Sequence, residues 1–166
     1  MKKVILILVV LSSCIDNTAD EFSDNGYKYI DEKKYQLAIL EFNKAIEIDT
    51  THKKSYKGKA SAKYKLEDFE GSLLDINKAI EIDPNDDEAY FSRGYFKYKM
   101  GKLRAAIMDY NRAIDLNPDD QLYYYATSRT KFELEDSTAG CLDLIKMEVL
   151  FDVEDYDVSY RKMHCN

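Results

Sequence analysis

The sequence lacks several features that enzymes and metalloproteins commonly need. It has no tryptophan, only two histidines among 166 residues, and no glycine-rich loop of the kind that cradles phosphates. His52 and His164 have no Ser, Cys or Asp set around them at the sequence spacing of a catalytic triad or a metal site. The sequence therefore predicts no enzyme activity, no metal site and no cofactor.

Proline and glycine are also scarce, with two and six residues respectively. Both interrupt helices, so their scarcity allows helices to run with few breaks. No alternation of apolar and polar residues indicates β-strands. With 45% hydrophobic and 33% charged residues, the composition is not that of a disordered chain. We therefore expect one all-α unit of domain size.

An excess of positive charge is missing as well. The net charge is −7, and it becomes −9 if residues 1–13, which contain two lysines, are removed. A chain this acidic has no overall field that attracts nucleic acid. Nucleic acid is therefore not an expected partner.

No apolar run is long enough to cross a membrane as a helix. Residues 4–11 are eight apolar residues behind two lysines, whereas a spanning helix needs about 20. A charged start followed by a short apolar run is typical of an export signal. The alternatives are a cleaved secretory signal or an N-terminal anchor.

The export signal ends in a sequence, LSSC at 11–14, that resembles the bacterial lipobox. The resemblance implies that residues 1–13 are a lipoprotein signal peptide and that Cys14 carries the lipid, followed by a short tether over 14–20. The expected location is then the bacterial cell envelope, with a lipid anchor in a membrane. The outer membrane is favoured, and the acidic residues behind Cys14 leave the leaflet open.

What the sequence does contain is a regular repeat. The segment NKAIEIDP at 77–84 has near-copies at 43–50 and 111–118, which defines one constant period. Such a period is typical of stacked helix-turn-helix units. Small residues, which allow helices to approach closely, recur with it at Gly26, Ala60, Gly94 and Ser128 and at Ala38, Ser72, Ala106 and Gly140. Large apolar residues, which fill the space beside them, recur at Phe42, Ile76, Tyr110 and Leu144.

This pattern resembles the tetratricopeptide repeat, most closely over residues 89–118. The resemblance covers about four-fifths of the chain, although Phe22, Tyr56, Tyr90 and Tyr124 stand in the family's tryptophan column. It implies a right-handed α-solenoid over 21–154, with a C-terminal capping helix over 155–166. The units are expected at about 19–52, 53–86, 87–120 and, in degenerate form, 121–154. First helices are expected near 20–33, 54–66, 88–100 and 122–134, and second helices near 35–48, 69–82, 103–116 and 137–150.

The resemblance also implies a concave groove, lined by the first helices, that binds a peptide or a helix of a partner protein. Phe91, Tyr95 and Tyr98 lie at i, i+4 and i+7, on one face of a helix. Shifting this face by one period completes the candidate set, which is Lys57, Ser61, Tyr64, Phe91, Tyr95, Tyr98, Tyr125, Arg129 and Phe132. The alternative for any single ring is packing between units.

The family's carboxylate clamp for C-terminal peptides is not reproduced in this sequence. Lys57 and Arg129 could replace its cations, but its asparagines are missing, and Ser61 and Ser92 are the nearest polar substitutes.

The segment 53–65 carries six lysines and no acidic residue. One interpretation is a helix face balanced by the acidic neighbours Glu47, Asp49, Asp75 and Glu81. The other is a landing site for an acidic partner.

Two cysteines remain if Cys14 is lipidated. Cys141 and Cys165 could form a disulfide, which persists beyond the inner membrane and would pin the cap over the open end of the solenoid. The alternative is a buried thiol and a free thiol on the tail.

These features together predict a membrane-anchored protein–protein interaction module of the bacterial envelope, with a peptide or helix as its ligand. One alternative is a non-catalytic accessory subunit of an envelope assembly or secretion complex. An envelope enzyme is the least favoured alternative.

Overall fold

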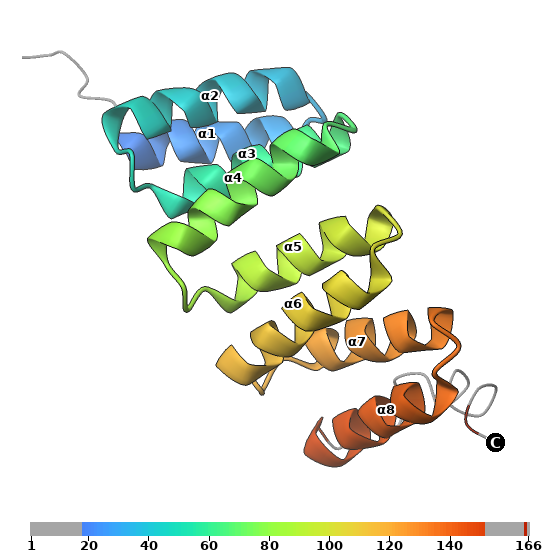
Figure 1. Ribbon diagram of the computed structural model, residues 1–166. Coiled ribbons are helices and arrows are strands. Elements are labelled where there is room, and N and C mark those ends of the chain that lie inside the picture. Colours follow the sequence, from blue (N-terminus) through green and yellow to red (C-terminus); the bar gives the residue numbers. More distant parts are fainter. Residues whose placement is uncertain (1–17, 152–164, 166) are drawn as a thin grey trace, which may run out of the picture.

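The computed structural model describes residues 18–151 and Cys165. These residues form eight α-helices and no strand (Figure 1). In chain order the helices are α1 (Ala19–Asp31), α2 (Tyr35–Ile48), α3 (Lys53–Lys65), α4 (Phe69–Ile82), α5 (Asp87–Lys99), α6 (Leu103–Leu116), α7 (Gln121–Glu133) and α8 (Ser137–Phe151). Consecutive helices pair and the pairs stack, so that α1 and α2 lie at one end and α7 and α8 at the other. The all-α solenoid is confirmed.

Several predictions fall on residues that the structure does not describe. The signal peptide, Cys14 and most of the tether lie outside the described residues, as does the predicted cap apart from Cys165. Within the described helices, none is long and apolar enough to cross a membrane.

The predicted helix bounds agree closely with the structure. Helices α2, α4 and α6 begin and end where the period predicts, and α8 extends one residue further. The first helices begin one residue before the predicted positions and end one or two residues before them. The turn that follows each first helix accounts for these early ends.

Each first helix ends in a turn with one residue in the left-handed backbone conformation. This residue has a φ of 59° at Lys33, 64° at Glu67, 72° at Gly101 and 62° at Glu135, so it too recurs once in every unit. In the third unit, the amide of Lys102 donates to the carbonyl of Lys97 and that of Gly101 to the carbonyl of Tyr98, both at 2.9 Å. This is a Schellman turn, which ends the helix and satisfies its last carbonyls.

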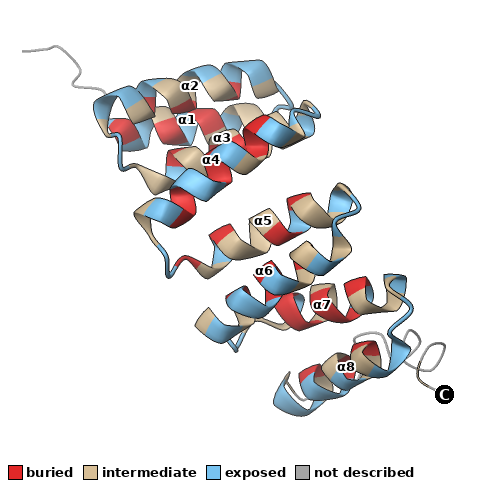
Figure 2. Ribbon diagram, in the orientation of Figure 1, coloured by how far each residue is buried: buried red, intermediate tan, exposed pale blue. Residues whose placement is uncertain are grey.

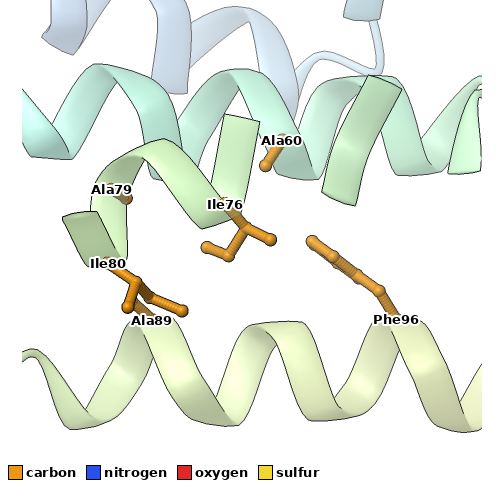
Figure 3. Packing of buried hydrophobic residues seen from close by; sticks show 6 residues of the cluster. All are labelled: Ala60, Ile76, Ala79, Ile80, Ala89 and Phe96. Atoms are coloured by element: carbon orange, nitrogen blue, oxygen red, sulfur yellow. The ribbon is translucent and has the colours of Figure 1, made fainter. Parts of the chain in front are cut away.

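The predicted columns of small and large residues form the core. Figure 2 shows the buried residues on the sides of the helices that face their neighbours. Phe42 is fully buried against Gly26 and Gly58, where an added Cβ would lie 2.5 Å and 2.3 Å from its ring. In the middle of the solenoid, Ile76 and Phe96 approach each other from α4 and α5 (Figure 3). Clusters of buried residues therefore connect neighbouring units, as stacking requires.

A partly buried ion pair repeats inside three of the units, and the sequence predicted only one of its acidic members, Asp75. Asp75, Asp109 and Asp143 occupy the same position in successive second helices, with side chains 9%, 6% and 19% exposed. Each binds a lysine of the preceding first helix at 2.6 to 2.7 Å, and these are Lys63, Lys97 and Lys131. The three lysines and the three aspartates each recur with the period of the repeat, so the sequence contains the signal that predicts the pair.

The last unit is joined to the C-terminus by a disulfide. Cys141 in α8 is bonded to Cys165, with the two Cα atoms 5.6 Å apart. Cys165 packs against the cluster formed by Tyr124, Leu144 and Met147. Cys165 is thereby held against the last unit that the structure describes.

Candidate functional site

A pocket of about 170 Å³ lies between the first helices of the last two units. Its walls are mostly apolar and come from α5 and α7, with one ring from α6. The lining residues are Phe91, Tyr95 and Tyr98 of α5, Tyr110 of α6, and Leu122, Tyr125, Ala126, Arg129 and Thr130 of α7. Five of the nine predicted groove residues therefore converge here, and they are Phe91, Tyr95, Tyr98, Tyr125 and Arg129.

Ring packing holds the wall of the pocket in place. Tyr110 is only 1% exposed, and its ring centroid lies 5.5 Å from that of Phe91. Phe91 also packs against Tyr123 of α7 at 4.9 Å, so it bridges two units. Tyr95, in contrast, is 37% exposed and contacts Tyr64 of α3 through its ring edge. Rigidly packed rings, with Tyr95 exposed to solvent, make a preformed surface for an apolar side chain.

The rim of the pocket is polar. The Tyr98 hydroxyl donates a hydrogen bond to the carboxylate of Glu133, and this bond is the main reason why the pKa of Tyr98 is raised. Burial raises it further, whereas the nearby guanidinium of Arg129 acts in the opposite direction. A hydroxyl, a carboxylate and a guanidinium thus surround an apolar pocket, which gives a ligand both an anchor point and polar partners.

Family models of the tetratricopeptide repeat match the chain over residues 26–52, 60–101 and 87–120. The chain carries tetratricopeptide repeats. No curated protein sequence matches the chain.

Solved repeat structures share this fold. MamA from Desulfovibrio magneticus RS-1, from residue 41 to its end, superposes with a TM-score of 0.74 at 19% identity, over 85% of this chain and 80% of that chain. The first TPR domain of Spaghetti (RPAP3), bound to the HSP90 peptide SRMEEVD, gives 0.67 at 26% identity, over 72% and 94%. The Arabidopsis OM64 TPR domain gives 0.67 at 22% identity, over 70% and 97%.

Four of the predicted groove residues lie elsewhere in the repeats. Lys57 does not line the pocket, because its side chain is 17% exposed and binds Asp86 at 3.0 Å and Glu88 at 2.8 Å. Tyr64 stacks on Phe96 with ring centroids 4.7 Å apart. Phe132 packs against the cluster of the fourth unit, and the half-buried Ser61 is not part of the pocket wall.

These four residues do not line the pocket that the other five form. A one-period shift of a helix face predicts which side of the helix a residue occupies. It does not predict that a lysine finds a carboxylate or that a ring stacks within the core. For Tyr64 and Phe132, the alternative of packing in the core describes the structure.

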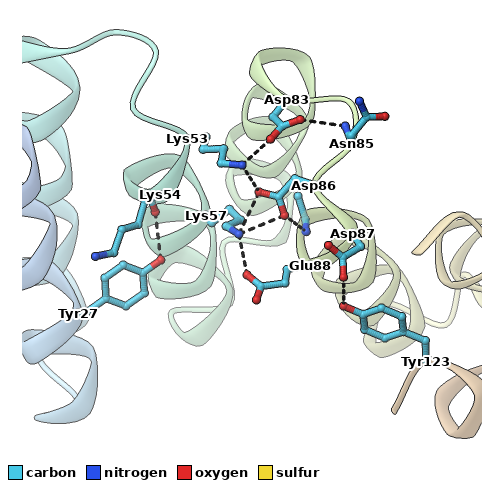
Figure 4. Close-up of polar contacts among 11 residues, drawn as sticks. Tyr27, Lys53, Lys54, Lys57, Asp83, Asn85, Asp86, Asp87, Glu88 and Tyr123 are labelled. Atoms are coloured by element: carbon cyan, nitrogen blue, oxygen red, sulfur yellow. Dashed lines mark hydrogen bonds and ion pairs between the residues drawn. The ribbon is translucent and has the colours of Figure 1, made fainter. Parts of the chain in front are cut away.

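The lysine-rich helix α3 is balanced by acidic residues. Figure 4 shows Lys53 and Lys57 meeting Asp83, Asp86 and Glu88 at the junction with α5. The remaining pairs are Lys54 with Asp24 at 2.7 Å, Lys59 with Asp75 at 3.2 Å and Lys63 with Asp75 at 2.7 Å. Of the four acids predicted from the sequence, only Asp75 pairs with this helix among the described residues. The other partners lie in neighbouring loops and helices, and the position of a residue on one helix face does not predict them.

Electrostatics strengthens this junction. Burial alone would lower the pKa of Lys57, but the hydrogen bonds to Glu88 and Asp86 outweigh it and raise the pKa above its ordinary value. Lys57 is therefore charged throughout the physiological range. It is held by the protein's own carboxylates, so it is not a free cation for a ligand.

The structure places a serine and an aspartate beside His52, an arrangement that the sequence spacing does not indicate. His52 Nδ1 lies 2.8 Å from Ser55 Oγ, and Nε2 lies 3.1 Å from Asp20 Oδ1. Ser55 is fully buried, whereas the Asp20 side chain is 80% exposed. A catalytic nucleophile must be accessible to its substrate, and Ser55 is not. The three residues therefore connect α1 to α3 and do not form a catalytic triad.

Proposed function

We propose that this repeat chain is a protein-interaction module that holds a peptide or helix of a partner protein in the groove between α5 and α7. The observation that carries the proposal is the pocket formed by Phe91, Tyr95, Tyr98 and Tyr125, with Arg129 at its edge. Large, stiff rings beside an arginine are the residue types that most often dominate binding energy at interfaces. The pocket has room for about five or six water-sized groups, which suits one apolar side chain of the ligand.

The peptide-bound Spaghetti domain supports the choice of a protein ligand. That structure is described as bound to an HSP90 peptide that ends in an acidic sequence. In the present chain, Lys57 is bound to Asp86 and Glu88, and the asparagines of the family's clamp are missing. We therefore place the main anchor of the ligand in the aromatic pocket rather than at a terminal carboxylate.

The test compares Tyr95→Ala with Glu81→Ala, an exposed residue on α4. Partners are captured from membranes with each variant, and the affinity of an identified partner peptide is then measured. Truncating a central ring commonly costs about 2 kcal/mol or more, roughly thirtyfold in affinity. We expect this loss for Tyr95→Ala and none for Glu81→Ala, with melting temperatures close to the wild type. Unchanged capture by Tyr95→Ala would reject the groove.

The proposed setting is the bacterial envelope, with the chain anchored through a lipid on Cys14. The support is the short apolar run and the LSSC sequence that ends it. Metabolic labelling with a fatty acid should mark the wild type, and Cys14→Ala should block processing or release the protein from membranes. An unlabelled wild-type protein would reject the anchor without affecting the groove.

A non-catalytic accessory subunit of a larger envelope complex is the second candidate function. It is favoured by the large apolar side chains that the second helices expose to solvent, because a fixed subunit binds through more than its groove. Retention of all partners by Tyr95→Ala would support this alternative.

A further inference from the structure

The second helices expose one large apolar residue at the same position in every unit. These residues are Leu40, Leu74, Met108 and Leu142, which are 54%, 72%, 73% and 61% exposed. We call the exposed side of α2, α4, α6 and α8 the outer face. Packing explains why the buried columns repeat, but it does not explain an exposed apolar column. A row of exposed apolar residues commonly marks an interaction site.

Each residue of this row has a cation four positions later, on the same side of its helix. The cations are Lys44, Lys78, Arg112 and Lys146. In the first two units the cation is bound within its own helix, because Lys44 pairs with Glu41 and Lys78 with Glu81, both at 2.6 Å.

The last two units differ in the state of these cations. Arg112 lies over the Tyr90 ring at 5.7 Å, and Lys146 lies over the Tyr124 ring at 5.2 Å. Arg104, one turn before Met108, is exposed as well. In the part of the chain that the structure describes, none of these three cations pairs with a carboxylate. The described part of the outer face of the last two units therefore carries three cations that form no direct ion pair there.

The apolar row also widens in the last unit. Leu142, Ile145 and Val149 lie at i, i+3 and i+7 on α8 and are 61%, 43% and 78% exposed. In α6 the positions equivalent to the last two are Asn111 and Asp115. Apolar residues with this spacing form a seam of the kind through which two helices pack.

We propose that the outer face of α6 and α8 binds an acidic amphipathic helix of a partner protein. The apolar side of that helix packs on Leu142, Ile145 and Val149, beside Met108. Its acidic residues pair with Arg104, Arg112 and Lys146. The cations favour a partner with negative charge. The i, i+3 and i+7 spacing of the apolar residues on α8 favours a partner that is helical.

The experiment uses the full chain and two synthetic helical peptides. Both carry leucines at i, i+3 and i+7; one has glutamates beside them and the other has lysines at the same positions. Binding is followed by fluorescence anisotropy at two salt concentrations. We expect the acidic peptide to bind, to weaken as salt is raised, and to outcompete the basic peptide by about tenfold or more.

Two sets of variants locate the site. Ile145→Asn with Val149→Asp gives α8 the residue types that α6 carries at these positions, so the fold should tolerate them. We expect this pair to weaken the acidic peptide by about tenfold or more. Arg112→Gln with Lys146→Gln should remove most of the salt dependence. Lys44→Gln in α2 and Tyr95→Ala in the groove are the matched controls, and both should bind the peptide like the wild type.

Several outcomes would overturn the proposal. Absence of binding up to about 1 mM peptide, or equal binding of the two peptides, would reject an acidic helix. If Tyr95→Ala weakened peptide binding as much as the α8 variants do, the peptide would bind in the groove and not on the outer face. Binding of the protein to anionic vesicles, lost with the α8 variants, would assign the face to a membrane. Dimerisation lost with the same variants would assign it to a second copy. Binding only after removal of residues 152–166 would assign it to the chain's own C-terminus.

Discussion

The first two units and the last two share one backbone period but use their charged and aromatic side chains differently. In the first half, the lysines of α3 are bound to the carboxylates of Asp24, Asp75 and Asp86. In the second half, the rings of α5 and α7 leave a pocket. The repeat determines the position of each backbone residue. The type of residue at that position determines whether its side chain stabilises the contact between units or lines the pocket.

The same division appears on the outer face. Lys44 and Lys78 are paired with glutamates of their own helices, whereas Arg112 and Lys146 have no ion pair among the described residues. Both proposed binding surfaces thus belong to the last two units.

The largest expected effect comes from Asp86, the N-cap of α5. Its carboxylate accepts the Ala89 amide at 2.9 Å and binds Lys57 at 3.0 Å, and the residue is 7% exposed. Asp86→Ala removes the cap and one of the two carboxylates that bind Lys57, so we expect it to lower the free energy of unfolding by about 3 kcal/mol. Chemical denaturation measures the change.

The control for this prediction lies one period later. Asp120 is the N-cap of α7, accepts the Leu122 amide at 2.9 Å and has no ion pair among the described residues. Asp120→Ala should therefore cost only about 1 kcal/mol. Asp86→Asn, which keeps a capping oxygen and loses the charge, should lie between the two. Equal costs for the two alanine variants would contradict the contrast between the halves.

A smaller effect is expected from the packing of glycines. Gly58 lies against the fully buried ring of Phe42, and an added Cβ would lie 2.3 Å from it. In the last unit, a Cβ added at Gly140 would lie 3.0 Å from the ring of the half-buried Phe132. We expect Gly58→Ala to cost about 2 kcal/mol, because neither ring nor backbone can move aside. Gly140→Ala should be close to neutral, since helix propensity offsets a small shift of the ring. Melting temperatures distinguish them.

The sequence predicted the fold far better than the site. Small residues such as Ala38 and large ones such as Phe42 recur at fixed spacing, and this spacing determines how helices cross, so helix bounds followed within one or two residues. The groove depended on how side chains of neighbouring units meet. Lys57 pairs with Asp86 and Glu88, and the period of the sequence does not predict such ion pairs between neighbouring units.

A third prediction concerns alkaline pH and the link between the first two units. The Tyr27 hydroxyl donates to the carbonyl of Lys54 at 3.0 Å, and its ring packs on Phe42. Burial first, and then the carboxylates of Glu88, Asp86 and Asp24, raise the pKa of Tyr27 from 10.0 to about 12. The folded state therefore favours the neutral phenol. Its stabilisation is complete below about pH 10 and is lost as the pH rises through 12.

The Tyr27→Phe variant isolates this contribution. It should unfold more easily than the wild type near neutral pH, because it lacks the hydrogen bond, by about 1 kcal/mol. Between pH 10 and 12 the wild type should lose up to about 2 kcal/mol more stability than the variant. Parallel curves of melting temperature against pH would show that Tyr27 titrates alike in both states.

The smallest expected effect sets the third unit against the other three. At the left-handed turn position, only the third unit has glycine, at Gly101, whereas Glu67 and Glu135 adopt the same backbone at φ of 64° and 62°. A side chain in this conformation is strained, and glycine relieves the strain but is more flexible when unfolded. Glu67→Gly and Glu135→Gly should therefore each stabilise the fold by about 0.5 to 1 kcal/mol, while Gly101→Ala destabilises it by a similar amount. Glu67→Ala separates the causes, because it removes the charge and keeps the strain. If Glu67→Ala stabilises as much as Glu67→Gly, the gain comes from charge in an acidic chain and not from the turn.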